Sequence, residues 1–344
     1  MNGRLSLKHG PTLEGRSFGY QGAIAGEVVF ATGMTGYPEA FTDPSFAGQI
    51  LVMTYPLIGN YGVPDRRYWE SDRLHIAGLI VSTYNETPSH YASRQTLSEW
   101  LVRGKVPALE VKDTRLLTKL IREQGTMLGK IEHAQNGTAF EDPNLTNLVA
   151  RVSQKNVTYE GRGTKTIVQI DCGTKRNITQ CFIKRGVRVI TVPWNMNPLS
   201  LHERFDGVLI SNGPGDPMMA TETVKIVTTL FQKRIPMLGI CLGNQILALA
   251  AGGKTKKMKF GHRGQNQPCV LVGTNTCYLT TQNHGFMVSK LPIGFKEWFR
   301  NSNDQSNEGI IHTKLPIMSV QFHPEANPGP VDTEWIFDFF ISKL

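Results

Sequence analysis

Apolar residues change their spacing near the middle of this chain, and the change divides it into two parts. In the first part, short apolar runs at residues 27–30, 49–54 and 76–81 are separated by Gly, Pro and Asp, as in strands joined by turns. Apolar residues at helical spacing follow at residues 93–103 and 114–124. The pattern predicts a mixed, strand-rich α+β domain.

The second part alternates apolar strands with helical stretches. Strands are expected at residues 167–170, 187–192, 207–211 and 235–240, and this alternation is typical of βαβ units with a parallel sheet. Shorter strands between residues 254 and 289 are expected to form an inserted β region. We therefore predict an α/β fold whose C-terminal part is a doubly wound, mostly parallel sheet.

A polar segment at residues 151–165 is rich in Gln, Asn, Gly, Arg and Thr and separates the two patterns. A chain of 344 residues also exceeds the usual size of a single domain. We predict domains at residues 1–150 and 166–344, joined by a linker at residues 151–165.

Cys241 lies between an apolar run and a helix-forming run, on a predicted strand-to-helix turn. Gly239 and Gly243 stand on either side of it, and glycines allow a sharp turn that pushes a reactive atom out above a sheet. The helix N-terminus behind the turn favours a thiolate over a thiol. The alternative is an inert core cysteine, because free cysteines are usually buried among apolar residues.

His323 and Glu325 follow a strand-like run at residues 317–322. In an extended chain residues two apart point to the same side, and Pro324 between them restricts the backbone. A thiolate nucleophile needs a base, and the base needs a group that fixes its tautomer. With Cys241, these residues predict a catalytic triad at the carboxyl ends of strands, where α/β proteins form their sites.

A glycine-rich loop at residues 211–217 follows another predicted strand. Its backbone N–H groups, together with the N–H of Leu242, are expected to stabilise the oxyanion that forms when a thiolate attacks an amide. The alternative is a Gly/Pro turn that takes no part in the chemistry.

The composition, 40% hydrophobic and 19% charged, is ordinary for a globular protein. No apolar run reaches the length of a membrane span and the first residues lack a secretory pattern, so we expect a cytoplasmic protein without membrane association. Five cysteines without a CxxC pair favour free thiols in a reducing compartment. No zinc-ligand spacing occurs, so no metal is expected.

The formal net charge is +9, and four of the lysines lie between residues 254 and 259. No nucleic-acid recognition motif or aromatic platform accompanies these lysines. A solvated face or a contact with an acidic partner subunit is therefore favoured over binding to nucleic acid.

Three of these segments resemble the class I (triad) glutamine amidotransferase domain, which hydrolyses glutamine to glutamate and ammonia. They are the turn around Cys241, the loop SNGPGDP at residues 211–217 and the run QFHPE at residues 321–325.

The first part resembles the small subunit of carbamoyl-phosphate synthetase, and the resemblance covers essentially the whole chain. It rests on GYPEA at residues 36–40, TDPS at 42–45, TYPLIGNYG at 54–62, DTR at 113–115 and REQGTM at 122–127. Two further strings, RGQNQP at residues 263–268 and NEGI at 307–310, are more similar to the fused eukaryotic forms.

The resemblance implies roles for further residues. The glutamine-binding set is expected to be Ser45, Gly213, Gly215, Leu242, Gln245, Asn283, Gly285 and Phe286. Within that set, Gly213 and Leu242 are expected to offer the oxyanion N–H groups. Ammonia is expected to leave past Pro328 and Gly329.

The resemblance also implies a mechanism and a partner. Cys241 attacks the glutamine amide, His323 protonates the departing ammonia, and water hydrolyses the glutamyl thioester. Ammonia then passes through a dry passage to a large synthetase chain, which is either a separate subunit or a region fused downstream. That partner is expected to hold ATP and Mg, and no cofactor is expected in this chain, which has no P-loop.

Two features depart from the family pattern: Asn244 stands where many members have histidine, and the stretch at residues 65–69 is shorter than expected. They leave open a non-catalytic regulatory or scaffold form of the same fold. A free-standing hydrolase of γ-glutamyl compounds is a third alternative, which the first part of the chain disfavours. The pathway served, pyrimidine, arginine or urea, is not decided by these residues.

Overall fold

The computed structural model describes residues 2–133 and 137–344. The chain forms two compact units, unit 1 at Met1–Thr146 and unit 2 at Asn147–Leu344. Met1 and residues 134–136, which the predicted first domain includes, lie outside the described residues.

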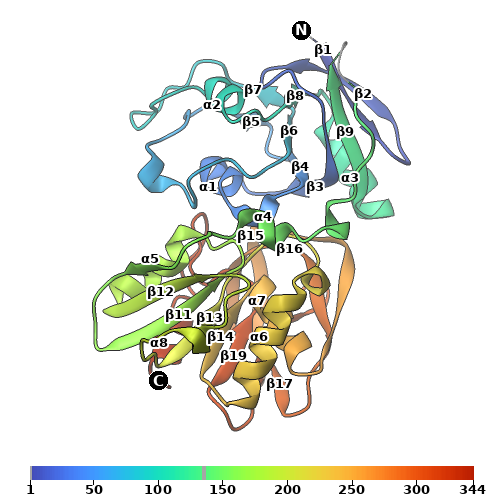
Figure 1. Ribbon diagram of the computed structural model, residues 1–344. Coiled ribbons are helices and arrows are strands. Elements are labelled where there is room, and N and C mark those ends of the chain that lie inside the picture. The colour runs from blue at the N-terminus through green and yellow to red at the C-terminus, as the bar shows by residue number, and fades with distance from the viewer. Residues whose placement is uncertain (1, 134–136) are drawn as a thin grey trace. The chain divides into compact units, whose positions relative to one another are not determined.

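Unit 1 is built on a closed β-barrel with strand order β1-β2-β8-β6-β4-β3-β9 (Figure 1). The pairs β3–β4, β4–β6 and β6–β8 are parallel, and the remaining pairs of the barrel are antiparallel. The elements are β1 Asn2–Leu7, β2 Thr12–Ser17, β3 Ile24–Ala31, α1 Tyr37–Phe41, β4 Gln49–Met53, β5 Leu57–Ile58, β6 Gly78–Val81, β7 Thr83–Tyr84, α2 Leu97–Arg103, β8 Ala108–Glu110, α3 Thr114–Gln124 and β9 Met127–His133.

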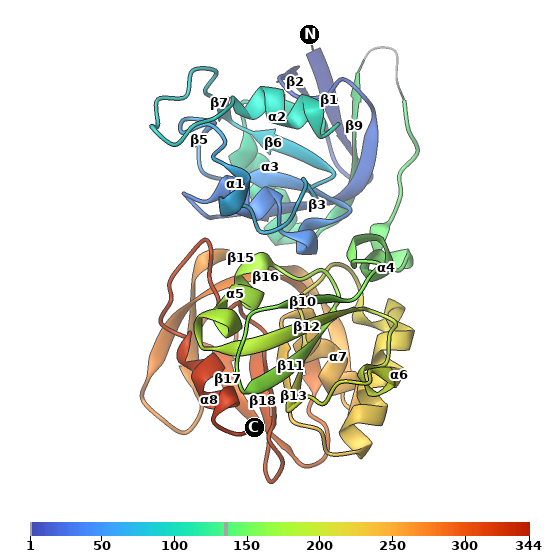
Figure 2. The ribbon, with the colours of Figure 1, turned by 60° about the vertical axis from the view of Figure 1, so that its left-hand side comes forward.

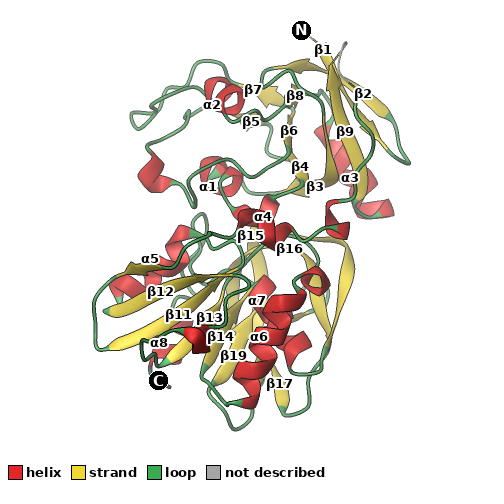
Figure 3. Cartoon of the chain, in the orientation of Figure 1, coloured by secondary structure: helices red, strands yellow, loops and turns green. Residues whose placement is uncertain are grey.

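The core of unit 1 joins apolar side chains of the barrel strands with those of helices α1 and α2. Figure 3 shows these helices in red and the strands in yellow. Trp100 of α2 packs in one cluster with Leu51 of β4 and Leu79 of β6, all of them buried. Because the sheet closes into a barrel, neither of its outermost strands is left with an unpaired edge. The buried side chains and the closed sheet together stabilise this strand-rich unit.

Unit 2 is an α/β unit with a single mixed sheet in the order β10-β12-β11-β13-β14-β19-β18-β17-β15-β16. Strands β12, β11, β13, β14 and β19 are parallel, and the others are antiparallel. The elements are α4 Leu148–Val152, β10 Thr158–Glu160, β11 Lys165–Asp171, α5 Arg176–Lys184, β12 Val187–Pro193, β13 Gly207–Ile210, α6 Thr221–Gln232, β14 Met237–Ile240, α7 Leu242–Ala250, β15 Lys254–Leu271, β16 Cys277–Lys290, β17 Phe295–Asn301, β18 Asn307–His312, β19 Ile317–Val320 and α8 Trp335–Ile341.

Helices cover both faces of the parallel strands (Figure 2). Ile246 of α7 packs with Val208 of β13 on one face, whereas Phe337 of α8 packs with Leu209 on the other. Successive residues of a strand point to opposite faces, so a continuous apolar run supplies both clusters. This is the doubly wound arrangement that the apolar runs predict.

Two of the predictions made from the sequence are wrong in unit 2. Residues 151–165 are not a free linker, because strand β10 in this segment pairs with β12 and Val157 packs on the core of unit 2. Residues 254–289 do not hold shorter strands of an inserted region either. They form most of β15 and β16, two long antiparallel strands that extend the same sheet and contain β-bulges, whose irregular registers disguise strand length in the sequence.

Two surface segments bear on the sequence predictions. The four lysines between residues 254 and 259 are exposed on β15. The short stretch at residues 65–69 forms a 3-10 turn that Asp65 caps. Among the residues that the structure describes, no helix has the length and apolar character that crossing a bilayer requires.

Candidate active site

Cys241 connects strand β14 to helix α7, as the sequence predicts. Its backbone has φ 55° and ψ −105°, a conformation that residues other than glycine rarely adopt. The side chain is buried, and Sγ lies 3.5 Å from the carbonyl oxygen of Asn283, to which the thiol donates. The strain of the turn is therefore concentrated on the cysteine itself.

The glycines on either side of Cys241 are required because the chain packs closely there, and not because they adopt an unusual backbone dihedral. A Cβ on Gly243 would lie 2.0 Å from the carbonyl oxygen of Ile210, and one on Gly239 would lie 2.6 Å from that of Gly243. Helix α7 can begin this close to the sheet only because both positions lack a side chain. The glycine pattern thus fixes where the helix starts and where Cys241 stands.

His323 and Glu325 lie just beyond strand β19, which is the parallel neighbour of β14. Nδ1 of His323 donates to Oε1 of Glu325 at 2.6 Å, and both side chains are buried. Nε2 of His323 is also buried and is hydrogen-bonded to none of the described residues. The proton on Nδ1 therefore leaves the lone pair on Nε2 as the ring's basic position.

Lys175 is a member of this cluster that the sequence reading missed. Its Nζ lies 3.0 Å from Oε1 of Glu325 and also donates to the carbonyl oxygen of Ala326, with both charged side chains buried. Asn177 holds the same turn by donating from Nδ2 to the carbonyl oxygen of Glu325 at 2.6 Å. Lys175 follows strand β11, so it reaches the site from the same edge of the parallel sheet as Cys241.

The charges of this cluster support one another. Burial by itself lowers the pKa of His323, but the carboxylate of Glu325 and the sulfur of Cys241 outweigh it and raise that pKa above its usual range. Burial by itself raises the pKa of Glu325, but Lys175 and His323 outweigh it and hold that pKa low. The carboxylate is therefore ionised at neutral pH and stabilises a proton on the imidazole.

Replacing Glu325 by glutamine should lower the pKa of His323, because the largest interaction that raises this pKa is lost. The titration of the His323 ring protons by NMR measures the change. The pKa should fall in Glu325→Gln, whereas Glu334→Gln, a half-buried residue not bonded to His323, should leave it unchanged. An unaltered His323 titration in Glu325→Gln would show that the carboxylate does not stabilise the imidazolium.

Two backbone N–H groups lie near the thiol. Leu242 begins helix α7, and its side chain is so close to Gly213 that a Cβ there would come within 2.8 Å of Leu242 Cδ2. No acceptor within the described part of the chain takes the N–H of Leu242 or of Gly213. Gly215, in the same loop, has φ 82°, which glycine adopts without strain. The loop and the helix start therefore offer donors to a developing oxyanion.

Four of the residues expected to line a glutamine pocket lie on helix α7 and strand β16, and one of them contacts the thiol. Asn283 contacts Sγ through its carbonyl oxygen. Gln245 of α7 donates from Nε2 to the carbonyl oxygen of Phe286 at 2.8 Å, which joins helix and strand, and Gly285 lies between Asn283 and Phe286. The amide nitrogen of Gln245 therefore donates within the protein, both to Phe286 and to Oε1 of Gln321 at 3.2 Å.

The side chain of Asn244, the residue that departs from the family pattern, makes its hydrogen bonds outside the triad, while its backbone N–H donates to the carbonyl oxygen of Cys241 at 3.0 Å. Its Nδ2 donates to Oε1 of Gln321 at 3.1 Å, and its Oδ1 accepts from the hydroxyl of Ser319 at 2.8 Å. All three side chains are fully buried. Asn244 therefore joins helix α7 to β19 and the residues that precede His323.

Asn244→Ala should lower the free energy of unfolding by about 1–3 kcal/mol, because it removes two buried hydrogen bonds and leaves the hydroxyl of Ser319 without this acceptor. Urea unfolding followed by circular dichroism measures the change. Asn303→Ala, at an exposed turn, is the matched control and should stay within about 0.5 kcal/mol of the parent. Equal stability of Asn244→Ala and the parent would exclude this role.

The remaining predicted residues lie in two other places. Ser45 belongs to unit 1, where it is buried in a 3-10 turn and its N–H donates to Oδ1 of Asp43 at 2.9 Å. Pro328 and Gly329 follow Glu325 and pack on β16, where the hydroxyl of Thr281 donates to the carbonyl oxygen of Pro328 at 3.0 Å. Gly329 has φ 131°, and a Cβ there would overlap Thr281. The proposed exit segment therefore begins beside the triad.

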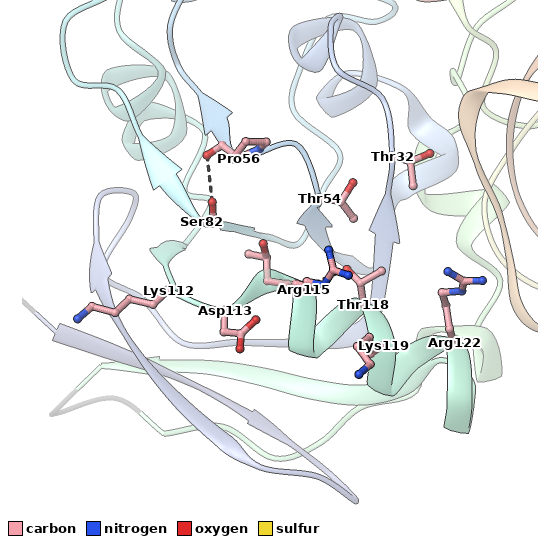
Figure 4. A pocket seen from close by; sticks show the side chains of 11 residues that line it. Thr32, Thr54, Pro56, Ser82, Lys112, Asp113, Arg115, Thr118, Lys119 and Arg122 are labelled. Atoms are coloured by element: carbon pink, nitrogen blue, oxygen red, sulfur yellow. Dashed lines mark hydrogen bonds between the residues drawn. The ribbon is translucent and has the colours of Figure 1, made fainter.

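Unit 1 contains a separate pocket of about 530 Å³ beside helix α3 (Figure 4). Its four cationic side chains outnumber its one carboxylate, Asp113, which caps the helix. It is lined by Thr32, Thr54, Pro56, Ser82, Lys112, Asp113, Thr114, Arg115, Thr118, Lys119 and Arg122. The pocket is suited to an anionic group, and none of the predicted site residues lines it.

Models of two known families match this chain in succession. Residues 5–131 match the carbamoyl-phosphate synthase small chain, CPSase domain. Residues 168–343 match the glutamine amidotransferase class-I family. The two matches correspond to unit 1 and unit 2.

Similar proteins of known sequence are much longer. The multifunctional protein URA2 of Saccharomyces cerevisiae is 46% identical over 386 residues, covering 99% of this chain and 17% of its own length. A mitochondrial carbamoyl-phosphate synthase of Mus musculus, named for ammonia, is 46% identical over 353 residues, with 99% and 23% covered. The multifunctional protein CAD of Squalus acanthias is 48% identical over 353 residues, with 98% and 16% covered.

The chain thus spans less than a quarter of the length of each of these relatives. The similarity extends over both units, and the amidotransferase match covers the residues around Cys241, His323 and Glu325. The chain therefore belongs to the class-I glutamine amidotransferases and carries, ahead of that domain, the small-chain domain of carbamoyl-phosphate synthase.

Proposed function

We propose that this chain hydrolyses glutamine to glutamate and ammonia and supplies the ammonia to a large synthetase chain for carbamoyl phosphate synthesis. The observation that carries the proposal is the buried His323–Glu325 pair, which lies beside the strained turn at Cys241. The two family matches and the relatives named above support the same assignment.

In the first half of the reaction, Nε2 of His323 accepts the thiol proton of Cys241 and Glu325 stabilises the resulting imidazolium. The thiolate attacks the side-chain carbonyl carbon of glutamine and forms a carbon–sulfur bond. The N–H groups of Gly213 and Leu242 stabilise the negative oxygen. His323 then gives its proton to the amide nitrogen, and the carbon–nitrogen bond breaks. Ammonia departs, and the glutamyl group stays on Cys241 as a thioester.

In the second half, water enters where ammonia left. His323 takes a proton from the water, whose oxygen attacks the thioester carbonyl carbon, and the same two N–H groups stabilise the second oxyanion. The carbon–sulfur bond breaks, the proton returns to sulfur, and glutamate is released. Ser45, Gly215, Gln245, Asn283, Gly285 and Phe286 remain the proposed glutamine contacts.

Ammonia must reach the synthetase unprotonated, because ammonium has no lone pair with which to attack a carboxy-phosphate. We propose that it leaves past Pro328 and Gly329 through a passage that excludes water. ATP and Mg are proposed to bind the large chain, which is either a separate subunit or a fused region. The lengths and names of the relatives support such a partner.

Glutamate formation by the purified chain, alone and with the large chain from the same source, tests this function. We expect turnover of glutamine that rises when the large chain, ATP and bicarbonate are present. A relative is named for ammonia, so ammonia is supplied in a parallel assay. Carbamoyl phosphate made from ammonia but never from glutamine would contradict the proposal, and robust turnover of other γ-glutamyl compounds without a partner would favour a free-standing hydrolase.

We also propose a cytoplasmic location. Support comes from the five cysteines, all within residues 137–344, each of which is a free thiol. Because one relative is named as mitochondrial, fractionation of the source cells must separate cytosol from mitochondria. Recovery of the chain with the mitochondrial matrix would overturn the proposed location without affecting the chemistry.

A further inference from the structure

A second cluster of titratable side chains lies on the antiparallel strands of unit 2, and no step proposed above uses it. His262 on β15 and His284 on β16 stand directly opposite each other, and Glu308 comes from β18. All three side chains are buried, with Glu308 0% exposed. One ligand atom from each lies within 4.8 Å of the others.

A fourth donor, Oε1 of Gln282, lies between the two histidines. It is 2.9 Å from Nδ1 of His262 and 2.9 Å from Nε2 of His284. The hydroxyl of Thr280 donates to the carbonyl oxygen of Gln267 at 2.8 Å, so its oxygen must accept from the Gln282 atom 3.1 Å away. That atom is therefore the amide nitrogen, and the amide oxygen faces the histidines.

The proton positions on His284 follow in the same way. Its Nδ1 lies 2.8 Å from the carbonyl oxygen of Phe286, which can only accept, so Nδ1 carries the hydrogen. In the neutral form of the ring with its hydrogen on Nδ1, Nε2 directs its lone pair toward Oε1 of Gln282, 2.9 Å away. A cation between them would replace this repulsion by two attractive contacts.

Carboxylates provide the remaining donors. Oε1 of Glu308 is 3.3 Å from Nδ1 of His262, and its Oε2 is buried without a hydrogen-bond partner among the described residues. Oδ2 of Asp304 lies 3.0 Å from Nε2 of His262. A carboxylate on the outer nitrogen orients a metal-binding imidazole and leaves the inner nitrogen for the metal.

We propose that His262, Gln282, His284 and Glu308 form a binding site for one divalent cation of the zinc type. The donor set is two imidazole nitrogens and two oxygens, which suits Zn²⁺. Three of the six separations among these donors, 2.9 to 3.3 Å, approach the edge of about 3.3 Å expected for a tetrahedron with zinc bonds of about 2.0 Å. The carboxylates of Glu308 and Asp304 balance the two positive charges.

The site would join β15, β16 and β18 directly behind the reactive thiol. Asn283, between two of the ligands, contacts Sγ of Cys241 through its carbonyl oxygen. A metal here would hold that segment of β16 in place. The sequence reading expects no metal, because the ligands are brought together by strand pairing across 46 residues (308 minus 262) and show no recognised spacing.

Equilibrium dialysis of the full chain against Zn²⁺ alone, with bound metal counted by mass spectrometry, tests the site without any glutamine. We expect one zinc per chain in the parent and in His202→Asn, an exposed histidine that serves as the matched control. The variants His262→Asn and Glu308→Gln should bind Zn²⁺ about 100-fold more weakly than the parent. Circular dichroism of each variant establishes that the fold is kept.

Thiols also bind zinc, so the chain with Cys241→Ser and Cys277→Ser together is tested beside the others and should keep its zinc. Substitution with Co²⁺ gives an independent reading, because a site without thiolate lacks the intense sulfur-to-cobalt absorption band. No stoichiometric zinc in the folded parent, undiminished zinc in both cluster variants, or a sulfur-to-cobalt band would each overturn the proposal. None of these outcomes depends on whether the chain hydrolyses glutamine.

Discussion

Cys241→Ser should reduce glutamate formation from glutamine by at least about 1,000-fold, because a serine hydroxyl is a far weaker nucleophile than a thiol at neutral pH. The residue is small and the change nearly isosteric, so the strained turn between β14 and α7 should be kept. In complex with the large chain, synthesis of carbamoyl phosphate from ammonia should continue at close to the parent rate. The two activities, measured on one preparation, separate loss of chemistry from loss of structure.

Cys277→Ser is the matched control, because Cys277 is the exposed cysteine on β16 and lies outside the triad. It should keep both activities. Retention of glutamine-dependent synthesis in Cys241→Ser would remove this cysteine from the mechanism. Equal loss of both activities in Cys241→Ser would indicate that the substitution damages the assembly rather than the nucleophile.

Lys175→Met should lower the free energy of unfolding of the protein by about 3–5 kcal/mol, because it removes the charge that contributes most to stabilising the buried carboxylate of Glu325. The same change should slow glutamine hydrolysis, since the carboxylate that orients His323 becomes less firmly held and less readily ionised. Urea unfolding and glutaminase assays measure the two effects.

The double variant Lys175→Met with Glu325→Gln is the sharper test, because removing both charges leaves no unpaired ion. It should recover at least half of the stability lost in Lys175→Met while remaining poorly active. Lys184→Met, at an exposed position of α5, should change stability by less than about 0.5 kcal/mol. The two single substitutions each lower the free energy of unfolding. If the double variant loses as much as the sum of these two losses, the broken ion pair does not explain the instability of Lys175→Met.

The effect of Lys175 on stability should depend on pH in a defined direction. Because the folded protein holds the pKa of Glu325 below the ordinary value of 4.5, the contribution of this carboxylate is present above that value. It is lost as the pH falls through the lower pKa of the folded state. The stability difference between the parent and Lys175→Met should therefore shrink as the solution is acidified below about pH 4.5. A constant difference would contradict the assigned charge state.

The sequence predicts those parts of the site whose residues lie close together in the chain. The turn at Cys241 and the pair His323 and Glu325 each combine a reactive residue with a strand that precedes it, and residues after parallel strands meet at one edge of a sheet. The apolar runs likewise predict the parallel strands of unit 2, because a strand buried on both faces reads as a continuous apolar segment. Helix α3 is predicted with the bounds it has.

What the sequence does not predict depends on pairing between distant segments. Lys175 meets Glu325 across 150 residues, and a lysine after a strand carries no sign of its buried partner. Strand β2 buries none of its side chains fully, so the barrel of unit 1 has no apolar signal there. The cluster of His262, His284 and Glu308 is assembled by antiparallel registers that only the structure defines.

Glutamine is expected to be cleaved through a covalent intermediate on one sulfur atom, that of Cys241. Acid quenching of the complete synthetase during turnover of isotope-labelled glutamine, followed by peptide mass spectrometry, tests it most directly. We expect one labelled glutamyl group on the peptide that contains Cys241, and none on that peptide in Cys241→Ser. Rapid glutamate release with no label at Cys241, or with label on another cysteine, would contradict it.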